Sequence, residues 1–284
     1  MTLLDVENLT VTFPTRTGTF EAVRGTTFSL ERERLGIVGE SGSGKSMTGR
    51  AILRLVRPPG EVRANHIRLG GEDLLAKSER AMRKVRGERI SMVMQDPKYS
   101  LNPVRSVGHQ IMEAYRLHER GSAKDARRRA LEMLEAVQIR DPERVFRAYP
   151  HEVSGGMGQR IMIAMMLIPN PEILIADEPT SALDVSVQQE VLGIMDRLVR
   201  DRGMGLIFIS HDLNLVASFC DRVLIMYAGR IVETLRADRL GEAEHPYTRG
   251  LLGSLPRLDA PTDRLTVLER DPLWRDMPSV EGRA

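Results

Sequence analysis

Apolar and polar residues alternate near the start of the chain, and short, largely apolar runs follow later. The alternation over Leu3–Phe13 predicts a half-buried strand, and Phe20–Leu30 predicts one or two more. The later runs are Leu35–Val38, Ile90–Gln95, Ile173–Ala176 and Leu206–Ser210. Runs of this length are typical of strands buried on both faces of a sheet. The pattern therefore predicts an α/β fold with a mainly parallel core sheet.

Helical spacing of apolar residues occurs between and after these runs. It predicts helices at Met47–Leu55, Val107–Leu117, Ala123–Val137, Met157–Leu167, Val187–Arg200 and Asn214–Cys220. Pro58-Pro59-Gly60 is expected to end the first of them. Arg222–Tyr227 and Arg230–Glu233 predict a hairpin around Ala228-Gly229. Alternation of helices with buried strands favours a helix-covered, mainly parallel sheet.

The middle of the chain differs from both ends because helical spacing replaces the α/β alternation. We therefore expect a helical subdomain at about 97–165 within a domain that spans 1–258, followed by a C-terminal extension at 259–284. The helix Met157–Leu167 is rich in methionine, and these side chains are expected to pack in a core and to hold no metal or cofactor.

Composition excludes several classes of protein. The 284 residues are 42% hydrophobic and 28% charged, and their net charge of +2 gives no strong field for nucleic acid or an anionic membrane. The sequence has no apolar run near the ~18 residues of a membrane span and no signal-peptide pattern. Cys220 is the only cysteine, which excludes an intrachain disulfide. These features lead us to expect a location in the cytoplasm.

The residues with the clearest chemistry follow the strand Leu35–Val38. The stretch Gly39-Glu40-Ser41-Gly42-Ser43-Gly44-Lys45-Ser46 fits the G-x-x-x-x-G-K-[ST] pattern at every position. Glycines let backbone N–H groups surround a polyphosphate, the lysine reaches its terminal phosphates, and the last hydroxyl can bind Mg²⁺. The helix that begins near Met47 adds a field that favours anions. A nucleotide site is predicted here, with a glycine-rich turn as the alternative.

Two carboxylates, Asp177 and Glu178, end the apolar run Ile173–Ala176. Asp177 is placed to hold Mg²⁺ through water, and Glu178 can polarise a water molecule for in-line attack on a γ-phosphate. Helix capping is the alternative explanation for paired acids at a strand end. The phosphate loop on another strand favours the catalytic interpretation.

A second glycine-containing stretch, Val153-Ser154-Gly155-Gly156-Met157, precedes the methionine-rich helix. Its backbone N–H groups can cradle an anion, although a helix N-cap would use the same residues. This stretch, the phosphate loop, Gln95, the carboxylate pair, Ser181-Ala182-Leu183-Asp184 and His211 occur in the order seen in ATP-binding cassette (ABC) ATPases. The chain resembles this family over about residues 1–258. The resemblance implies a P-loop NTPase fold with an N-terminal antiparallel β-subdomain and an inserted helical subdomain.

The resemblance also implies how two such domains share ATP and Mg²⁺. They pair head to tail, so that each ATP lies between the phosphate loop of one subunit and Ser154, Gly155 and Gly156 of the other. Asp184 then links the two subunits. Phe13 lies where the family places an aromatic that stacks on adenine, although a core strand residue would look the same.

The catalytic roles follow from the same comparison. Glu178 corresponds to the general base, and Lys45 contacts the phosphates. His211 orients water and the γ-phosphate, although a lone histidine is more often structural. Gln95 contacts Mg²⁺ and water and senses the partner domain, and Ser46 and Asp177 complete the metal site.

Finer features resemble the oligopeptide, dipeptide and nickel importer branch of the family. They are Gln95-Asp96-Pro97, Ser100-Leu101-Asn102-Pro103, Pro150-His151-Glu152, Asp184-Val185-Ser186-Val187-Gln188 and, most clearly, His245-Pro246-Tyr247-Thr248-Arg249. The resemblance implies an ATP-hydrolysing subunit on the cytoplasmic face of the plasma membrane. Its implied partners are two permease subunits that dock near Gln95–Pro103, a second ATPase subunit (a paralogue or another copy) and, indirectly, an extracytoplasmic solute-binding protein.

Three features depart from the family pattern. Glu31-Arg32-Glu33-Arg34 replaces a glycine-containing turn, and Gly158 after the signature is expected to loosen the first turn of its helix. The tail has no cysteine, so we expect no iron–sulfur cluster. Two alternative functions are a soluble ABC-type ATPase acting on nucleic acid or ribosomes and a regulatory module without turnover. ABC-type ATPases that act on nucleic acid or ribosomes usually have two cassettes or a long coiled coil, which argues against the first alternative. The presence of Glu178 and His211 argues against a module without turnover.

Overall fold

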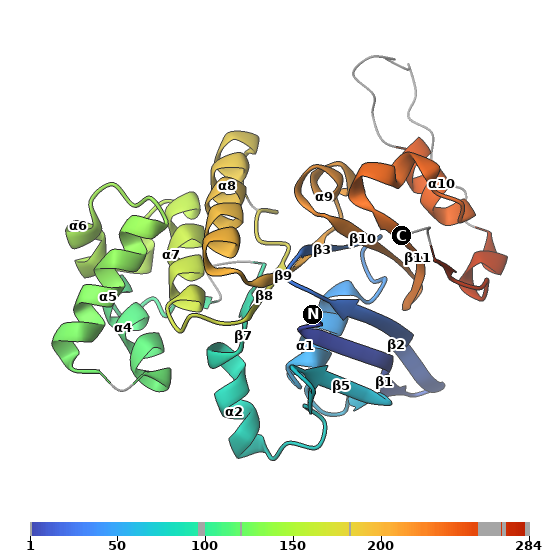
Figure 1. Ribbon diagram of the computed structural model, residues 1–284, viewed down its shortest axis with the longest axis horizontal. Coiled ribbons are helices and arrows are strands. Elements are labelled where there is room, and N and C mark those ends of the chain that lie inside the picture. Colours follow the sequence, from blue (N-terminus) through green and yellow to red (C-terminus); the bar gives the residue numbers. More distant parts are fainter. Residues whose placement is uncertain are drawn as a thin grey trace. The chain divides into compact units, whose positions relative to one another are not determined.

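The computed structural model describes residues 2–95, 100–119, 121–181, 183–254, 268 and 271–281. The chain forms two compact units: one comprises residues 76–207, and the other comprises residues 2–75 and 208–284. Strand β9 (Gly205–Ser210) passes from the first unit into the second. Each unit is described by itself below (Figure 1).

An antiparallel sheet opens the unit formed by the two ends of the chain. Its strands are β1 (Leu4–Thr15), β2 (Gly18–Leu30), β4 (Glu61–Arg63), β5 (His66–Leu69) and β6 (Glu72–Asp73), in the order β2-β1-β5-β6 with β4 also paired to β1. The register places Leu4 opposite Leu30 and Phe13 opposite Phe20. Leu4, Val6 and other apolar residues of one face are fully buried, which explains the alternation in the sequence.

The same unit contains the strand that carries the phosphate loop. Strand β3 (Arg34–Val38) pairs in parallel with β10 (Arg222–Tyr227), which pairs antiparallel with β11 (Arg230–Arg236), and β12 (Val280–Glu281) adds to β11 in parallel. The helical elements are α1 (Lys45–Ile52), α9 (Leu213–Phe219), η2 (Ala237–Glu242), α10 (Pro246–Gly253) and η3 (Pro272–Arg275). Helix α9 packs on β3, and α1 packs on β1 and β2.

The other unit combines a parallel strand pair with a group of helices. Strand β7 (Ile90–Val93) pairs in parallel with β8 (Ile173–Asp177). The helical elements are α2 (Glu79–Glu88), α4 (Val107–His118), α5 (Ala123–Ala136), α6 (Pro142–Arg147), η1 (Pro150–Glu152), α7 (Gly155–Leu167) and α8 (Val185–Arg202). Helices α4, α5, α6 and α7 pack against one another and form the green cluster in Figure 1.

The structure confirms the α/β fold with antiparallel and parallel strands. The predicted strands and helices occur within a few residues of their expected bounds, but the expected end of the first helix was wrong and some elements were not predicted. Helix α1 ends at Ile52, before the prolines, because Arg54 adopts a left-handed φ of 53°. Gly158 lies in the first turn of α7, where its N–H donates to the carbonyl of Ser154 at 2.8 Å, and the loosening of this turn stays a prediction. Helices α2, α6 and α10 and strands β4, β6 and β12 were not predicted.

Further expectations concern the methionines of α7, membrane-spanning helices and the domain bounds. Met162 is fully buried in α7, as expected for a core methionine, whereas Met157 is partly exposed. Among the described residues, no helix combines the length and the apolar character needed to span a bilayer. Asp96 and Pro97, which belong to the expected docking region, and most of the expected extension at 259–284 lie outside the described residues. The domain bounds 1–258 and about 97–165 stay predictions.

Candidate nucleotide-binding site

The phosphate loop connects β3 to α1 and is held closely by its own lysine. The Lys45 side chain is buried, and its Nζ donates to the carbonyl oxygens of Gly39 at 2.7 Å and Glu40 at 2.8 Å. The Ser43 carbonyl accepts from the N–H of Gly229 at 3.1 Å, in the turn between β10 and β11. The loop is therefore folded over the start of α1 and fixed from the neighbouring hairpin.

Two observations fit a polyphosphate in this loop. Gly44 has a left-handed φ of 101°, and a Cβ there would lie 2.5 Å from the carbonyl oxygen of Ala22, so only glycine suits this position. The Ser43 hydroxyl is buried and has no hydrogen-bond partner among the described residues. A buried polar group without a partner needs an explanation, and a phosphate oxygen would supply one.

The predicted carboxylates occupy the end of β8. Asp177 is the last residue of the strand and is 3% exposed. Glu178 follows with a left-handed φ of 46°, which is rare outside glycine and is found often at functional sites. Its Oε2 accepts a hydrogen bond of 3.0 Å from Nε2 of Gln95, two residues beyond β7. The parallel pairing of β7 and β8 therefore brings Gln95 and Glu178 together.

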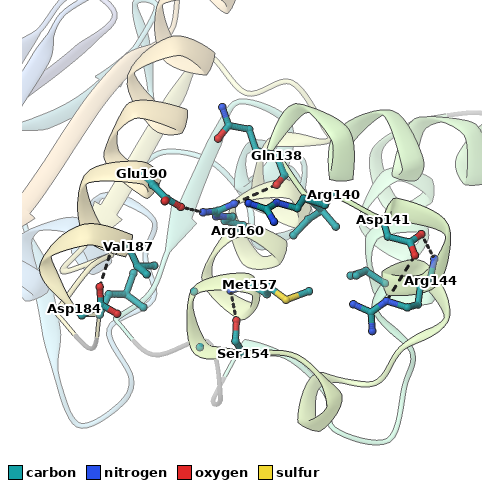
Figure 2. Close-up of a pocket in the computed structure, with 15 residues that line it drawn as sticks. Gln138, Arg140, Asp141, Arg144, Ser154, Met157, Arg160, Asp184, Val187 and Glu190 are labelled. Carbon is teal, nitrogen blue, oxygen red and sulfur yellow. Dashed lines mark hydrogen bonds and ion pairs between the residues drawn. The ribbon is translucent and has the colours of Figure 1, made fainter.

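The second glycine-containing stretch begins helix α7. Ser154 is the N-cap, and its hydroxyl accepts from the N–H of Met157 at 3.3 Å. A pocket of about 600 Å³ opens beside it, lined by residues that include Ser154, Gly155, Gly156, Met157 and Asp184 (Figure 2). The N-cap alternative and the anion-cradle interpretation are thus compatible, because the hydroxyl caps the helix while the glycines line a pocket.

Asp184 caps the next helix at the same pocket. Its carboxylate accepts from the Ser186 hydroxyl at 2.7 Å and from the N–H of Val187 at 3.0 Å. The Ser186 hydrogen bond, followed by the Val187 N–H, lowers the pKa of Asp184 below its usual range. In the same pocket Arg160 of α7 pairs with Glu190 of α8 and donates to the carbonyl of Gln138, which follows α5 (Figure 2).

The two remaining candidates are His211 and Phe13. His211 is exposed and follows β9, and Asp212 caps α9 by accepting from the N–H of Leu215. Phe13 is half-buried on β1, and its ring lies against Gly60, where a Cβ would be 2.6 Å from the ring edge. The core-residue alternative for Phe13 therefore has a contact in its favour, and its stacking on adenine stays a prediction.

Sequence reasoning missed one residue at the phosphate loop. The hydroxyl of Tyr247 accepts a hydrogen bond of 3.2 Å from the backbone N–H of Glu40. Tyr247 lies in the stretch His245–Arg249, which was noted only as a branch feature. No local signal could have connected two residues 207 positions apart.

A phosphate loop between a parallel strand and a helix, with a carboxylate pair ending another parallel strand, defines a P-loop nucleoside triphosphatase. A family model described as ABC transporter matches residues 23–181. The chain belongs to the ABC transporter family, as an ATPase.

Individual relatives agree with this assignment. The oligopeptide transport ATP-binding protein OppD of Bacillus subtilis is 48% identical over 274 residues, covering 95% of this chain and 76% of that protein. The dipeptide transport ATP-binding protein DppD of Haemophilus influenzae is 46% identical over 271 residues, covering 95% and 82%. The dimeric structure of MJ0796, a bacterial ABC transporter cassette, has a TM-score of 0.73 at 27% identity and covers 82% of this chain and 98% of that one. A dimeric post-hydrolysis state of MJ0796 bound to ADP and Pi has a TM-score of 0.71 at the same identity and coverage.

Proposed function

We propose that this chain is the ATP-binding and hydrolysing subunit of an importer for oligopeptides or dipeptides, acting through partner membrane subunits. The observation that carries this proposal is its similarity to peptide transport ATP-binding proteins along 95% of its length. Nickel or small metal complexes are the alternative substrates from the branch resemblance. None of the relatives described above favours the nucleic-acid alternative, and the net charge of +2 gives it no support.

The phosphate loop would hold the triphosphate of ATP, with Lys45 contacting phosphate oxygens. Ser46, Asp177 and Gln95 would hold Mg²⁺, which prefers oxygen ligands. Because Nε2 of Gln95 donates to Glu178, its amide oxygen is the atom left for the metal or for water. When bound, Mg²⁺ would neutralise charge that develops on the transferred phosphoryl group.

Glu178 would act as the general base. Its Oε2 accepts a hydrogen bond from Gln95, and the carboxylate would take a proton from the attacking water. His211 would orient that water and the γ-phosphate. Glu178 and Gln95 thus form a hydrogen-bonded pair. The position of the Glu178 carboxylate would depend on the metal and on any subunit that contacts Gln95.

Gly155 supports a site that a second subunit completes. A Cβ at Gly155 would meet no described atom within 4 Å, so nothing in the described part of this chain requires glycine there. Gly156 differs, because a Cβ would lie 2.6 Å from Cγ1 of Val187. We therefore propose that Gly155 is kept free for a phosphate of ATP bound to another ATPase subunit, paired head to tail with this one and either a paralogue or a second copy. Asp184 would link the two.

The proposed location is the cytoplasmic face of the plasma membrane, where two permease subunits would dock near Gln95–Pro103. An extracytoplasmic solute-binding protein would deliver the substrate to them. The whole complex would be the unit in which ATP hydrolysis drives uptake.

The test of hydrolysis is Glu178→Gln in the full complex with its permeases, compared with Glu242→Gln. Glu242 is exposed and makes no ion pair with another described residue, so it shows the effect of losing one carboxylate elsewhere. Removal of a general base should slow ATP turnover by about 10²–10⁴-fold while ATP binding is kept. Undiminished turnover in Glu178→Gln would contradict the general-base role.

The test of the shared site is Gly155→Ala, compared with Gly241→Ala, where a Cβ also meets no described atom within 4 Å. We expect neither substitution to lower the melting temperature. Gly155→Ala should nevertheless suppress ATP turnover and ATP-dependent pairing of subunits, measured by size-exclusion chromatography. Full activity of Gly155→Ala would argue against a phosphate at this position.

A further inference from the structure

Tyr247 contacts the phosphate loop at the peptide unit that also receives the lysine. The carbonyl of the Gly39–Glu40 peptide accepts from Lys45 Nζ at 2.7 Å, and the N–H of the same peptide donates to the Tyr247 hydroxyl at 3.2 Å. One peptide plane is therefore held from both sides. If it turned over, its carbonyl would point away from Lys45, and its N–H would lose the tyrosine oxygen.

The tyrosine itself is fixed by its surroundings. It is fully buried, and its ring packs on Tyr227 with centroids 4.4 Å apart and meets the edge of Trp274 at 6.3 Å. Phenylalanine would fill the same space, so the hydroxyl must have a reason to be buried. The Glu40 N–H supplies that reason, because a buried hydroxyl and a loop N–H each need a partner.

A second set of contacts sets where helix α10 begins. Glu233 of β11 is fully buried, and its Oε1 accepts from the N–H groups of Glu244 at 2.7 Å and His245 at 3.3 Å. His245 is the N-cap, and its Nδ1 accepts from the N–H of Tyr247 at 3.1 Å. This acceptor role requires a neutral ring, and burial lowers the pKa of His245. The contacts of Glu233 and His245 thus fix the start of α10 and position Tyr247 beside the phosphate loop.

We propose that Tyr247 is a positioning residue for ATP binding, which keeps the Gly39–Glu40 peptide in the orientation that presents Lys45 to the phosphates. The inference rests on the proposed ATP site and adds to it a residue from the C-terminal part of the chain. It gives the stretch His245–Arg249 a physical role at the nucleotide. With phenylalanine at 247, the loop would occupy other peptide orientations, and ATP binding would have to restore the competent one.

The experiment titrates Mg·ADP into the purified chain by calorimetry, for the wild type, Tyr247→Phe and Tyr227→Phe. Tyr227→Phe is the matched control, because it removes a hydroxyl from the neighbouring ring that makes no hydrogen bond with another described residue. Loss of one neutral hydrogen bond should weaken Mg·ADP binding by roughly three- to tenfold in Tyr247→Phe. Tyr227→Phe should bind as the wild type does. In the full complex, Tyr247→Phe should raise KM for ATP and leave kcat unchanged.

Two results would overturn the inference. One is unchanged affinity for Mg·ADP in Tyr247→Phe, whether or not its melting temperature falls, because the hydroxyl would then serve the fold alone. The other is equal weakening in Tyr227→Phe, which would assign the effect to the aromatic packing. Failure of the wild type to bind Mg·ADP would instead contradict the proposed function.

Discussion

Glycine at position 36 is required by packing and not by backbone conformation. Gly36 lies in β3, where its neighbours Leu35 and Ile37 are almost fully buried. A Cβ at this position would lie 2.3 Å from Cγ1 of Val216 in α9 and 3.2 Å from the sulfur of Cys220. Carbon atoms in contact are normally about 3.5–4.0 Å apart. Gly36→Ala must therefore push α9 away from the strand that carries the phosphate loop.

The size of the effect follows from the overlap. Overpacking of a core by one methyl group lowers the free energy of unfolding by about 1–3 kcal/mol. The lower entropy of the unfolded chain with alanine offsets about 0.4–1 kcal/mol of this loss. We expect Gly36→Ala to lower the free energy of unfolding by about 1–2 kcal/mol. Val216→Ala alone should lower it by about 1.5 kcal/mol or more, for two buried methyl groups and a cavity. In the double variant the new methyl group occupies the vacated space, so the two costs should not add.

The assay is urea unfolding of the four proteins followed by circular dichroism, with the interaction energy taken from the double-mutant cycle. We expect a favourable interaction energy of about 1–2 kcal/mol, which is set by the overlap that the double variant removes. Gly193→Ala is the control: a Cβ on this exposed glycine of α8 would meet no described atom within 4 Å, and alanine there should stabilise by about 0.5–1 kcal/mol. Additive costs at Gly36 and Val216 would refute the packing argument.

Three further outcomes are expected. Burial acts to raise the pKa of Asp221, but hydrogen bonds from Arg34 outweigh this effect and hold the pKa below its usual value. The ion pair therefore stabilises the fold above about pH 4 and stabilises it less as the pH falls further. In urea unfolding, Asp221→Asn should lower the free energy of unfolding by at most about 1 kcal/mol at pH 7 and by less below pH 4. Burial raises the pKa of the Cys220 thiol, so iodoacetamide should label it slowly in the folded chain and rapidly in urea, and equal rates would contradict its burial. Since Glu178 has a left-handed φ, Glu178→Gly should be more stable than Glu178→Ala by about 1 kcal/mol in thermal unfolding, and the reverse order would contradict backbone strain.

Much of the fold could be predicted because burial is encoded locally. The alternation in β1 and the apolar run of β8 correspond to the residues that the structure buries. Helix α2 was not predicted because few of its residues are buried. Only Met82 and Val85 of its ten residues are buried, and the rest is largely charged. A helix with so few apolar residues offers little apolar sequence from which to predict it.

Sequence alone determined the phosphate loop, the carboxylate pair and the second glycine-containing stretch. A polyphosphate must be met by glycines, a lysine and a hydroxyl at fixed spacing, and that spacing is a property of a few consecutive residues. Tertiary structure alone decided which distant groups support them. The contact of Tyr247 with Glu40 and the packing of Gly36 on Val216 each join segments far apart in the chain. Such contacts depend on how strands and helices pack, and no local pattern of residue types records them.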